Sequence, residues 1–421
     1  MMSKKNLMII IISALCLISL AGAGEKENKI EPKLVYEKRF DFEIEQGKIG
    51  EDGSLFPTIF VTKDRRVLFT DNRGNKKKTY RLSNNHKIFF SEDGKYVGIV
   101  YYPDRWWEVG ITIDLYNNKG DKISRIDLKD NLEPILIIGK NANYIVVQKL
   151  GMDELEGIDF YSQEGRLVKS YSAIIPHKVG DITVNIYLTG IGCYIPYSEL
   201  PIISSPGVAG DFLLCRAYSS PYDGTWLLVF KIDGELLLIK KMYGDAIPNF
   251  PTISNDGNYI IYNRYTPYDL VEKRGLTDNW AWETIKIYNS RNGITKEVGV
   301  TIPPSEKSKA PIIMDFTEDS KSFWIIHRNK FYFGDAEKGK IEYSWETQDT
   351  ALIVYAFTSL HGNYALCILA DGRIVVLNNR GKVIYEGCPS ESKILDAKFD
   401  EVRQEIIILS EKGIFKYTLV R

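Results

Sequence analysis

One short stretch recurs along the chain and constrains its fold more than any other feature. The clearest copy, 90–96, carries an Asp93-Gly94 pair and leads directly into the apolar run 97–100. Imperfect copies stand at 253–259, 316–321 and 360–364, and an apolar run follows each of them. Asp or Asn beside Gly between two apolar runs favours a tight turn that joins two antiparallel strands. The repeat therefore predicts a series of similar β-units.

A second recurring element is a strand, a tight Asn/Asp/Gly turn and another strand, in which Gly supplies the positive φ that closes a hairpin. Seven such hairpins are recognised, at 69–74, 115–120, 160–165, 229–234, 287–293, 332–339 and 377–381. If the strands of one unit are lettered a to d from the inside outward, the first kind of turn joins a to b and the second joins c to d. The units then span 45–83, 86–130, 134–173, 180–244, 249–302, 311–350, 351–390 and 393–421.

A repeat of about 40 residues with four strands is typical of a β-propeller. The last unit contains only three strands, and the N-terminal strand predicted at 34–42 is available as its outer strand, which would close the ring. The sequence therefore predicts an all-β protein, a single propeller of four-stranded antiparallel blades. Eight blades are expected, or seven if the first and last units merge.

The turn at 90–96, and its copy at 253–259, resemble the hallmark of WD40-like repeats in exported bacterial proteins, the TolB type. Two departures are Glu92 and Asn255, which stand where those repeats usually have Pro, and no Trp-Asp dipeptide ends the c strands. The resemblance covers most of the chain after residue 32. It implies the propeller architecture and says little about function, because propellers include both enzymes and scaffolds.

The N-terminus has the pattern of a secretory signal peptide. Lys4 and Lys5 precede the apolar stretch 7–20, and Ala21-Gly22-Ala23 offers small residues for cleavage after Ala23. The expected organisation is a signal peptide at 1–23, a charged linker at 24–32 and a propeller domain at 33–421, in an exported protein of the periplasm or the exterior. A lipid anchor at Cys16 and an uncleaved anchor remain alternatives. No later stretch is long and apolar enough to span a bilayer.

The composition limits which classes of partner and cofactor are expected. The 421 residues carry a net charge of −1, which gives no indication of nucleic acid or an anionic membrane as a partner. No cofactor or metal motif is present, and the four His residues are dispersed; of these, His177 is expected on a d–a connection.

Four cysteines follow the signal peptide, Cys193, Cys215, Cys367 and Cys388. A Cys193–Cys215 disulfide and buried thiols on strands are both open interpretations.

Because neighbouring strands of a blade run antiparallel, the connections between them alternate between the two faces of the ring. The a–b and c–d turns share one face, and the b–c and d–a connections share the other. The b–c connections are expected to be short in blades 1, 6, 7 and 8 and long in blades 2 to 5, where aromatic and acidic residues gather. Aromatic rings beside carboxylates suit a protein, peptide or glycan ligand. The candidate binding residues are Trp106, Trp107, Tyr268, Trp280, Asp104, Asp223 and Asp269.

Simple packing of loops is the competing explanation for these aromatics, and Trp226 and Trp282 are expected to pack because both lead directly into c strands. The favoured function is an exported, non-catalytic binding or scaffold propeller. One alternative is a glycoside hydrolase or lyase that uses carboxylates at the same rim, for which two are needed at a set separation. Its candidate acids are Asp104, Glu108, Asp223, Asp269, Asp278 and Glu283. Another alternative is a sensor or envelope assembly component. The ligand and the oligomeric state are left open.

Blade 4 carries an insertion at 188–210, predicted between strands a and b and hence on the face opposite the aromatic loops. Coverage of the channel mouth, a partner site and a tolerated excursion are all compatible with its composition.

Overall fold

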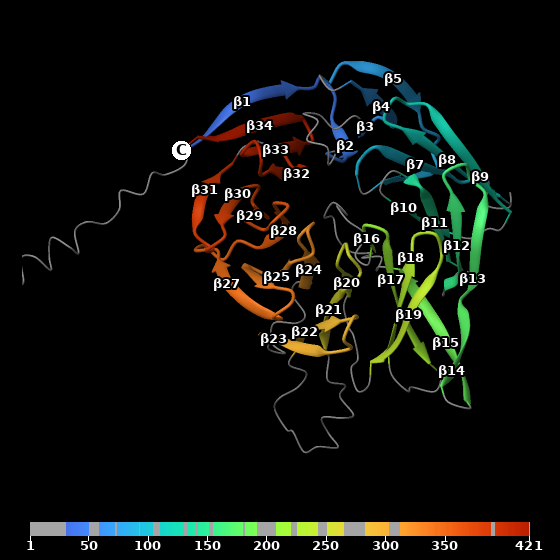
Figure 1. The fold of residues 1–421 in the computed structure, drawn as a ribbon. Coiled ribbons are helices and arrows are strands. Elements are labelled where there is room, and N and C mark those ends of the chain that lie inside the picture. Colours follow the sequence, from blue (N-terminus) through green and yellow to red (C-terminus); the bar gives the residue numbers. More distant parts are fainter. Residues whose placement is uncertain are drawn as a thin grey trace, which may run out of the picture.

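The computed structural model describes residues 31–49, 59–71, 74–91, 93–103, 110–129, 133–139, 142–150, 155–179, 182–191, 208–219, 225–242, 251–264, 283–302, 312–388 and 392–420. All regular elements of this part are strands, which pair in eight antiparallel sheets. Figure 1 shows the sheets following one another around a ring in sequence order, so that the last lies beside the first. The prediction of an eight-bladed propeller is confirmed.

The first four blades occupy the N-terminal half of the ring. Blade 1 consists of β2 (Ile44–Gly47), β3 (Ile59–Thr62), β4 (Arg66–Thr70) and β5 (Lys76–Arg81). Blade 2 consists of β6 (His86–Phe90), β7 (Tyr96–Tyr101), β8 (Ile111–Asn117) and β9 (Lys122–Leu128). Blade 3 consists of β10 (Glu133–Ile138), β11 (Tyr144–Leu150), β12 (Leu155–Ser162) and β13 (Leu167–Ser172). Blade 4 is larger, with β14 (Ile174–Val179), β15 (Ile182–Ile191), β16 (Val208–Ala209), β17 (Phe212–Ser219), β18 (Thr225–Lys231) and β19 (Leu236–Met242).

The other four blades complete the circle. Blade 5 consists of β20 (Thr252–Ile253), β21 (Tyr259–Arg264), β22 (Glu283–Asn289) and β23 (Thr295–Ile302). Blade 6 consists of β24 (Ile312–Phe316), β25 (Ser322–His327), β26 (Lys330–Asp335) and β27 (Lys340–Glu346). Blade 7 consists of β28 (Ile353–Thr358), β29 (Tyr364–Leu369), β30 (Ile374–Asn378) and β31 (Val383–Gly387). Blade 8 combines β32 (Ile394–Asp400), β33 (Glu405–Ser410) and β34 (Gly413–Val420) with the N-terminal strand β1 (Glu31–Arg39).

The two ends of the described chain close the ring together. Strand β1 pairs antiparallel with β34, from Glu31 opposite Val420 to Arg39 opposite Gly413. This confirms that the N-terminal strand completes the last blade, although it begins inside the stretch predicted as a linker and ends earlier than predicted. Beyond Arg39, the rings of Phe40 and Phe42 stack with centroids 4.9 Å apart.

The core lies between neighbouring blades. Both faces of the middle strands are covered, so the run from Leu227 to Phe230 is buried throughout, whereas the outer strand β5 is mostly exposed. This explains why the b and c strands read as continuous apolar runs, while strands that face water on one side alternate. At the junction of blades 3 and 4, for example, the ring centroids of Phe160 and Phe230 lie 5.9 Å apart.

The recurring turn is a structural joint. In blade 2, the Ser91 hydroxyl donates to Asp93 Oδ1 at 2.6 Å and accepts from the Tyr96 backbone N–H at 3.0 Å. Blade 5 repeats both bonds between Ser254, Asp256 and Tyr259. Blade 6 repeats them with Thr317 and Asp319. Gly94 takes a φ of 67°, the left-handed region that Gly adopts without steric cost. The motif therefore makes the a–b turn of the blade.

Blade 4 departs from the other blades. Its inner strand is divided, because β15 pairs with β17 from Ile186 to Ile191 while the short β16 pairs with the start of β17. The predicted insertion therefore interrupts strand a; residues 192–207 of it lie outside the described residues. Within the described part of the chain, no helix has the length and apolar character needed to cross a bilayer.

Candidate functional site

All seven candidate rim residues lie outside the described residues: Asp104, Trp106, Trp107, Asp223, Tyr268, Asp269 and Trp280. Glu108, Asp278 and Trp282 also lie outside them, and Glu283 opens β22. The neighbouring strands show where these connections attach. The connection 102–110 joins β7 to β8, and 265–282 joins β21 to β22, so both attach on the b–c side of the ring. In blades 1, 6, 7 and 8 the equivalent connections are only 63–65, 328–329, 370–373 and 411–412, as expected.

The prediction of a long b–c connection in blade 3 is wrong. Strand β11 runs to Leu150 and β12 already begins at Leu155, which leaves a connection no longer than that of blade 7. By its composition the acidic stretch 153–156 favours a loop, but Glu156 lies on β12 with its side chain exposed. Polar residues are tolerated there because the end of a blade strand meets water. The connection of blade 4, 220–224, is also shorter than expected.

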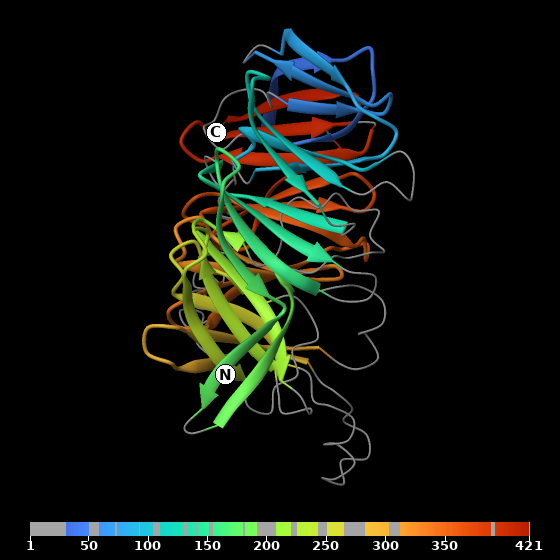
Figure 2. The same cartoon turned by 90° about the vertical axis from the view of Figure 1, so that its right-hand side faces the viewer.

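A β-hairpin that the sequence reasoning missed stands on the same face. Strands β14 and β15 pair from Ile174 opposite Tyr187 to Val179 opposite Ile182. Because β15 pairs with β17 only from Ile186 onward, the hairpin end projects beyond blade 4, as Figures 1 and 2 show. Gly180-Asp181 between two alternating apolar runs was the available signal. Strand β14 and the start of β15 form the d–a connection between blades 3 and 4, and from Ile186 onward β15 continues as the inner strand of blade 4.

The hairpin is packed against blade 4 by His177. Its ring meets the Trp226 ring edge-on, with centroids 5.7 Å apart. Trp226 is only 3 % exposed and also lies 5.7 Å from the Lys241 ammonium, so it packs as expected and is no part of a rim. On the same hairpin, Ile174 and Val179 are exposed. The projecting hairpin therefore has a fixed base and presents apolar side chains to solvent.

On the opposite face, the a–b turns of blades 5 to 8 are linked to one another. The Asn255 amide donates to the Glu318 carbonyl at 2.9 Å, and His361 Nδ1 lies 3.2 Å from Asp319 Oδ2. Glu401 of blade 8 in turn accepts from the Asn363 amide. These bonds fix the turns of neighbouring blades relative to one another.

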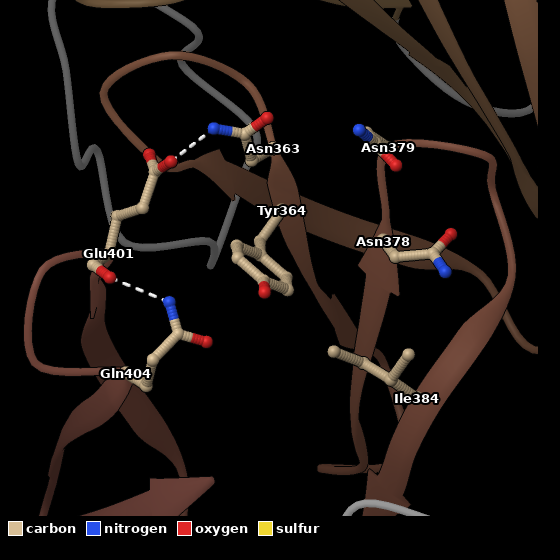
Figure 3. Close-up of a pocket in the computed structure, with 7 residues that line it drawn as sticks. All are labelled: Asn363, Tyr364, Asn378, Asn379, Ile384, Glu401 and Gln404. Atoms are coloured by element: carbon tan, nitrogen blue, oxygen red, sulfur yellow. Dashed lines mark hydrogen bonds between the residues drawn. The ribbon is translucent and has the colours of Figure 1, made fainter. Parts of the chain in front are cut away.

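A pocket of about 480 Å³ lies on this face at the junction of blades 7 and 8. Figure 3 shows Tyr364 at its centre, between Asn363, Glu401 and Gln404 on one side and Asn378, Asn379 and Ile384 on the other. The sequence reasoning assigned no site here. The residues come from three turns, from the adjoining ends of β29 and β30 and from the outer strand β31, and each turn by itself has an ordinary turn sequence.

Two carboxyl groups on inner strands have raised pKa values. Burial raises the pKa of Asp315 on β24 to about 7. Burial also raises the pKa of Asp396 on β32 to about 6, although its carboxylate accepts hydrogen bonds from the N–H groups of Ile49 and Ala397. In the described part of the chain, no group of three or more His, Cys, Asp or Glu side chains is arranged to hold a metal ion.

The cysteines agree in part with the sequence reasoning. Cys215 on β17 and Cys367 on β29 are buried, as one of the two interpretations expected, and burial raises the pKa of the Cys367 thiol. Cys388 is exposed. Cys193 lies outside the described residues, so its pairing with Cys215 stays a prediction.

No protein-family model matches the sequence, and no curated protein matches it. Solved structures do match in fold. BamB from Moraxella catarrhalis has a TM-score of 0.51 at 11 % identity, with 92 % of this chain and 100 % of that one covered. The C-terminal WD40 domain of Sif2 has a TM-score of 0.53 at 9 % identity, covering 93 % and 99 %. The architecture is that of the WD40 and BamB propellers.

A third neighbour is the dihydro-heme d1 dehydrogenase NirN in complex with DHE, with a TM-score of 0.53 at 13 % identity over 86 % of this chain and 71 % of that one. At such low identities these likenesses show the fold alone. Propellers of this architecture thus include proteins with different activities, so function has to be argued from the faces of this ring.

The raised pKa of Asp396 can be tested through the pH dependence of the protein's stability. Its pKa is raised from 3.8 to about 6 in the folded protein, so between these values the native state binds more protons than the unfolded chain. Stability therefore falls as pH rises through this window. From pH 4 to pH 7, we expect the wild-type protein to lose about 2 kcal/mol of unfolding free energy relative to Asp396→Asn. Urea unfolding of both proteins across this range measures the difference; parallel pH profiles would contradict the assignment.

Proposed function

We propose that this propeller is an exported, non-catalytic binding or scaffold protein that recognises a protein partner on the face of its b–c and d–a connections, over blades 2 to 5. The observation that carries the proposal is that the connections on this face differ in length and form from one blade to another. Blades 1, 3, 4, 6, 7 and 8 have b–c connections of a few residues, whereas the connections 102–110 and 265–282 and the β14–β15 hairpin depart from the repeat.

Departures from a regular scaffold are where binding residues usually lie. The hairpin adds exposed Ile174 and Val179 to this face, and the sequence of the two long connections adds Trp106, Trp107 and Trp280. Apolar and aromatic side chains together are enriched in the cores of protein interfaces. This composition favours a protein or peptide over a small polar ligand at the rim.

The test of the rim is a peptide array and a glycan array probed with the mature chain and with a variant in which Trp106, Trp107 and Trp280 are all replaced by Ala. We expect peptide hits that weaken at least about tenfold in the variant, because aromatic anchors carry a large share of interface energy. The matched control is Leu360→Ala with Val402→Ala, which removes exposed apolar side chains from the opposite face. Hits that are equally strong in the tryptophan variant would exclude the rim. Cleavage of a bound glycan would replace this proposal with the hydrolase or lyase alternative.

Export is a separate part of the proposal, and it rests on the signal-like pattern at 1–23. The intact mass of the protein from a secreting host, together with its N-terminal sequence, checks it. Cleavage after Ala23 is expected. A full-length chain retained inside the cell would contradict export, and a lipid-modified Cys16 would replace the soluble form with an anchored one.

A further inference from the structure

The pocket at the junction of blades 7 and 8 is lined by polar but almost uncharged groups. Four of its seven residues are amides, namely Asn363, Asn378, Asn379 and Gln404. Glu401 is the single carboxylate, and it already accepts from the Asn363 amide and lies 3.4 Å from the His361 backbone nitrogen. No lysine or arginine lines the pocket. The lining therefore disfavours an anion, and its four amides suit a polar ligand that both donates and accepts hydrogen bonds.

The turn chemistry orients several of these amides. Asn378 Oδ1 accepts the backbone N–H groups of Arg380 and Lys382, both at 3.0 Å, which leaves its amide N–H groups as donors. The Gln404 amide donates to the Glu401 carbonyl at 2.6 Å, which leaves its side-chain oxygen as an acceptor. The Asn363 amide donates to Glu401, so its oxygen also remains as an acceptor. Donors and acceptors are thus held in place by the turns before any ligand arrives.

Two apolar surfaces lie among these polar groups. The Tyr364 ring packs against Phe399 with centroids 4.7 Å apart, and Ile384 of the outer strand β31 lies across from it. Figure 3 shows the ring between two groups of polar side chains, with the Glu401 carboxylate and the Gln404 amide on one side and the Asn378 and Asn379 amides on the other. Ring and amides therefore border the same hollow.

We propose that this pocket binds a neutral saccharide. A sugar presents adjacent hydroxyl groups, each both donor and acceptor, which match the oriented amides, and its C–H face matches the Tyr364 ring and Ile384. The volume of about 480 Å³ lies inside the range of roughly 300–1,000 Å³ typical of small-ligand sites. Most such sites are mainly apolar, so a lining rich in amides favours a ligand rich in hydroxyl groups. This site lies on the face opposite the proposed rim and is independent of it.

The test uses the mature chain and a panel of neutral mono- and disaccharides, with binding followed by saturation-transfer NMR and titration calorimetry. Asn379→Ala removes an exposed amide that forms no turn bond among the described contacts, and Gln404→Met removes a polar end at nearly constant volume. We expect at least one saccharide to bind, and each variant to weaken its binding about fivefold or more.

Blade 2 supplies a matched control. Its c–d turn has the same pattern as that of blade 7, since Asn117 Oδ1 accepts from Lys119 and Asp121 as Asn378 Oδ1 accepts from Arg380 and Lys382. Asn118→Ala is therefore the counterpart of Asn379→Ala outside the pocket, and it is expected to leave saccharide binding unchanged. Failure of the whole panel to bind overturns the proposal. Equal binding by Asn379→Ala and wild type also overturns it, as does binding that is lost only in the tryptophan variant of the rim.

Discussion

A chain that begins at Glu43 is expected to be about 3 to 5 kcal/mol less stable than one that begins at Glu31. The shorter chain lacks β1 and with it Tyr36, Phe40 and Phe42, which pack on the buried cluster shared by blades 1 and 8. A fully buried side chain of this size contributes roughly 1.5 to 3 kcal/mol, and these three are partly buried. Thermal and urea unfolding of the two chains measure the effect.

The comparison isolates the closing strand, because the longer chain also lacks residues 1–30 and differs only by 31–42. The loss of β1 leaves the edge of β34 unpaired from Gly413 to Val420. An unpaired edge favours association with other chains, so the shorter chain should also self-associate as its concentration rises. A synthetic peptide of residues 31–42 is expected to raise its unfolding temperature, and a scrambled peptide is not. Equal unfolding curves for the two chains would show that the ring does not depend on β1.

The second large effect is expected from Phe230→Ala, which should lower the free energy of unfolding by about 3 to 5 kcal/mol. Phe230 is 0 % exposed, and its ring centroid lies 5.1 Å from that of Tyr171 and 5.9 Å from that of Phe160. These rings join blades 3 and 4, so the substitution leaves a cavity between two sheets. Neither sheet can shift to fill this cavity without disturbing the other.

A double-mutant cycle with Phe160→Ala tests whether the two rings act together. Because they are in contact, the effects of the two substitutions should not add. Val402→Ala is the control, since Val402 is 93 % exposed in the a–b turn of blade 8 and should change stability by less than about 0.5 kcal/mol. A loss below about 1 kcal/mol for Phe230→Ala would contradict the packing at this junction.

The blades were predictable because their joints are local. Ser91 and Asp93 form the turn by accepting the backbone N–H groups of Tyr96 and Lys95, which lie only a few residues away, so the same sequence produces the same turn wherever it recurs. The closing role of the N-terminal strand followed from counting, because the last unit contained three strands and an unpaired edge had to be covered.

The features of the two faces were harder to predict. The polar composition of the acidic stretch 153–156 favours a loop, whereas Glu156 occupies an exposed position on β12. The β14–β15 hairpin was missed because only Ile186 onward continues into the blade, and sequence spacing does not show where one sheet ends and a projecting arm begins. The predicted rim residues lie outside the described residues, and their role stays a prediction.

The repeat, the four-stranded blade and the strand that closes the ring were predictable from the sequence, whereas the choice between seven and eight blades needed the structure, which contains eight sheets. The predictable features depend on turns and apolar runs that are contiguous in the chain. That Asn363, Asn378 and Gln404 border one pocket became visible only in the folded chain. These residues belong to separate turns of two blades, and the distance between such turns depends on how adjacent sheets twist and pack, which no local pattern in the sequence specifies.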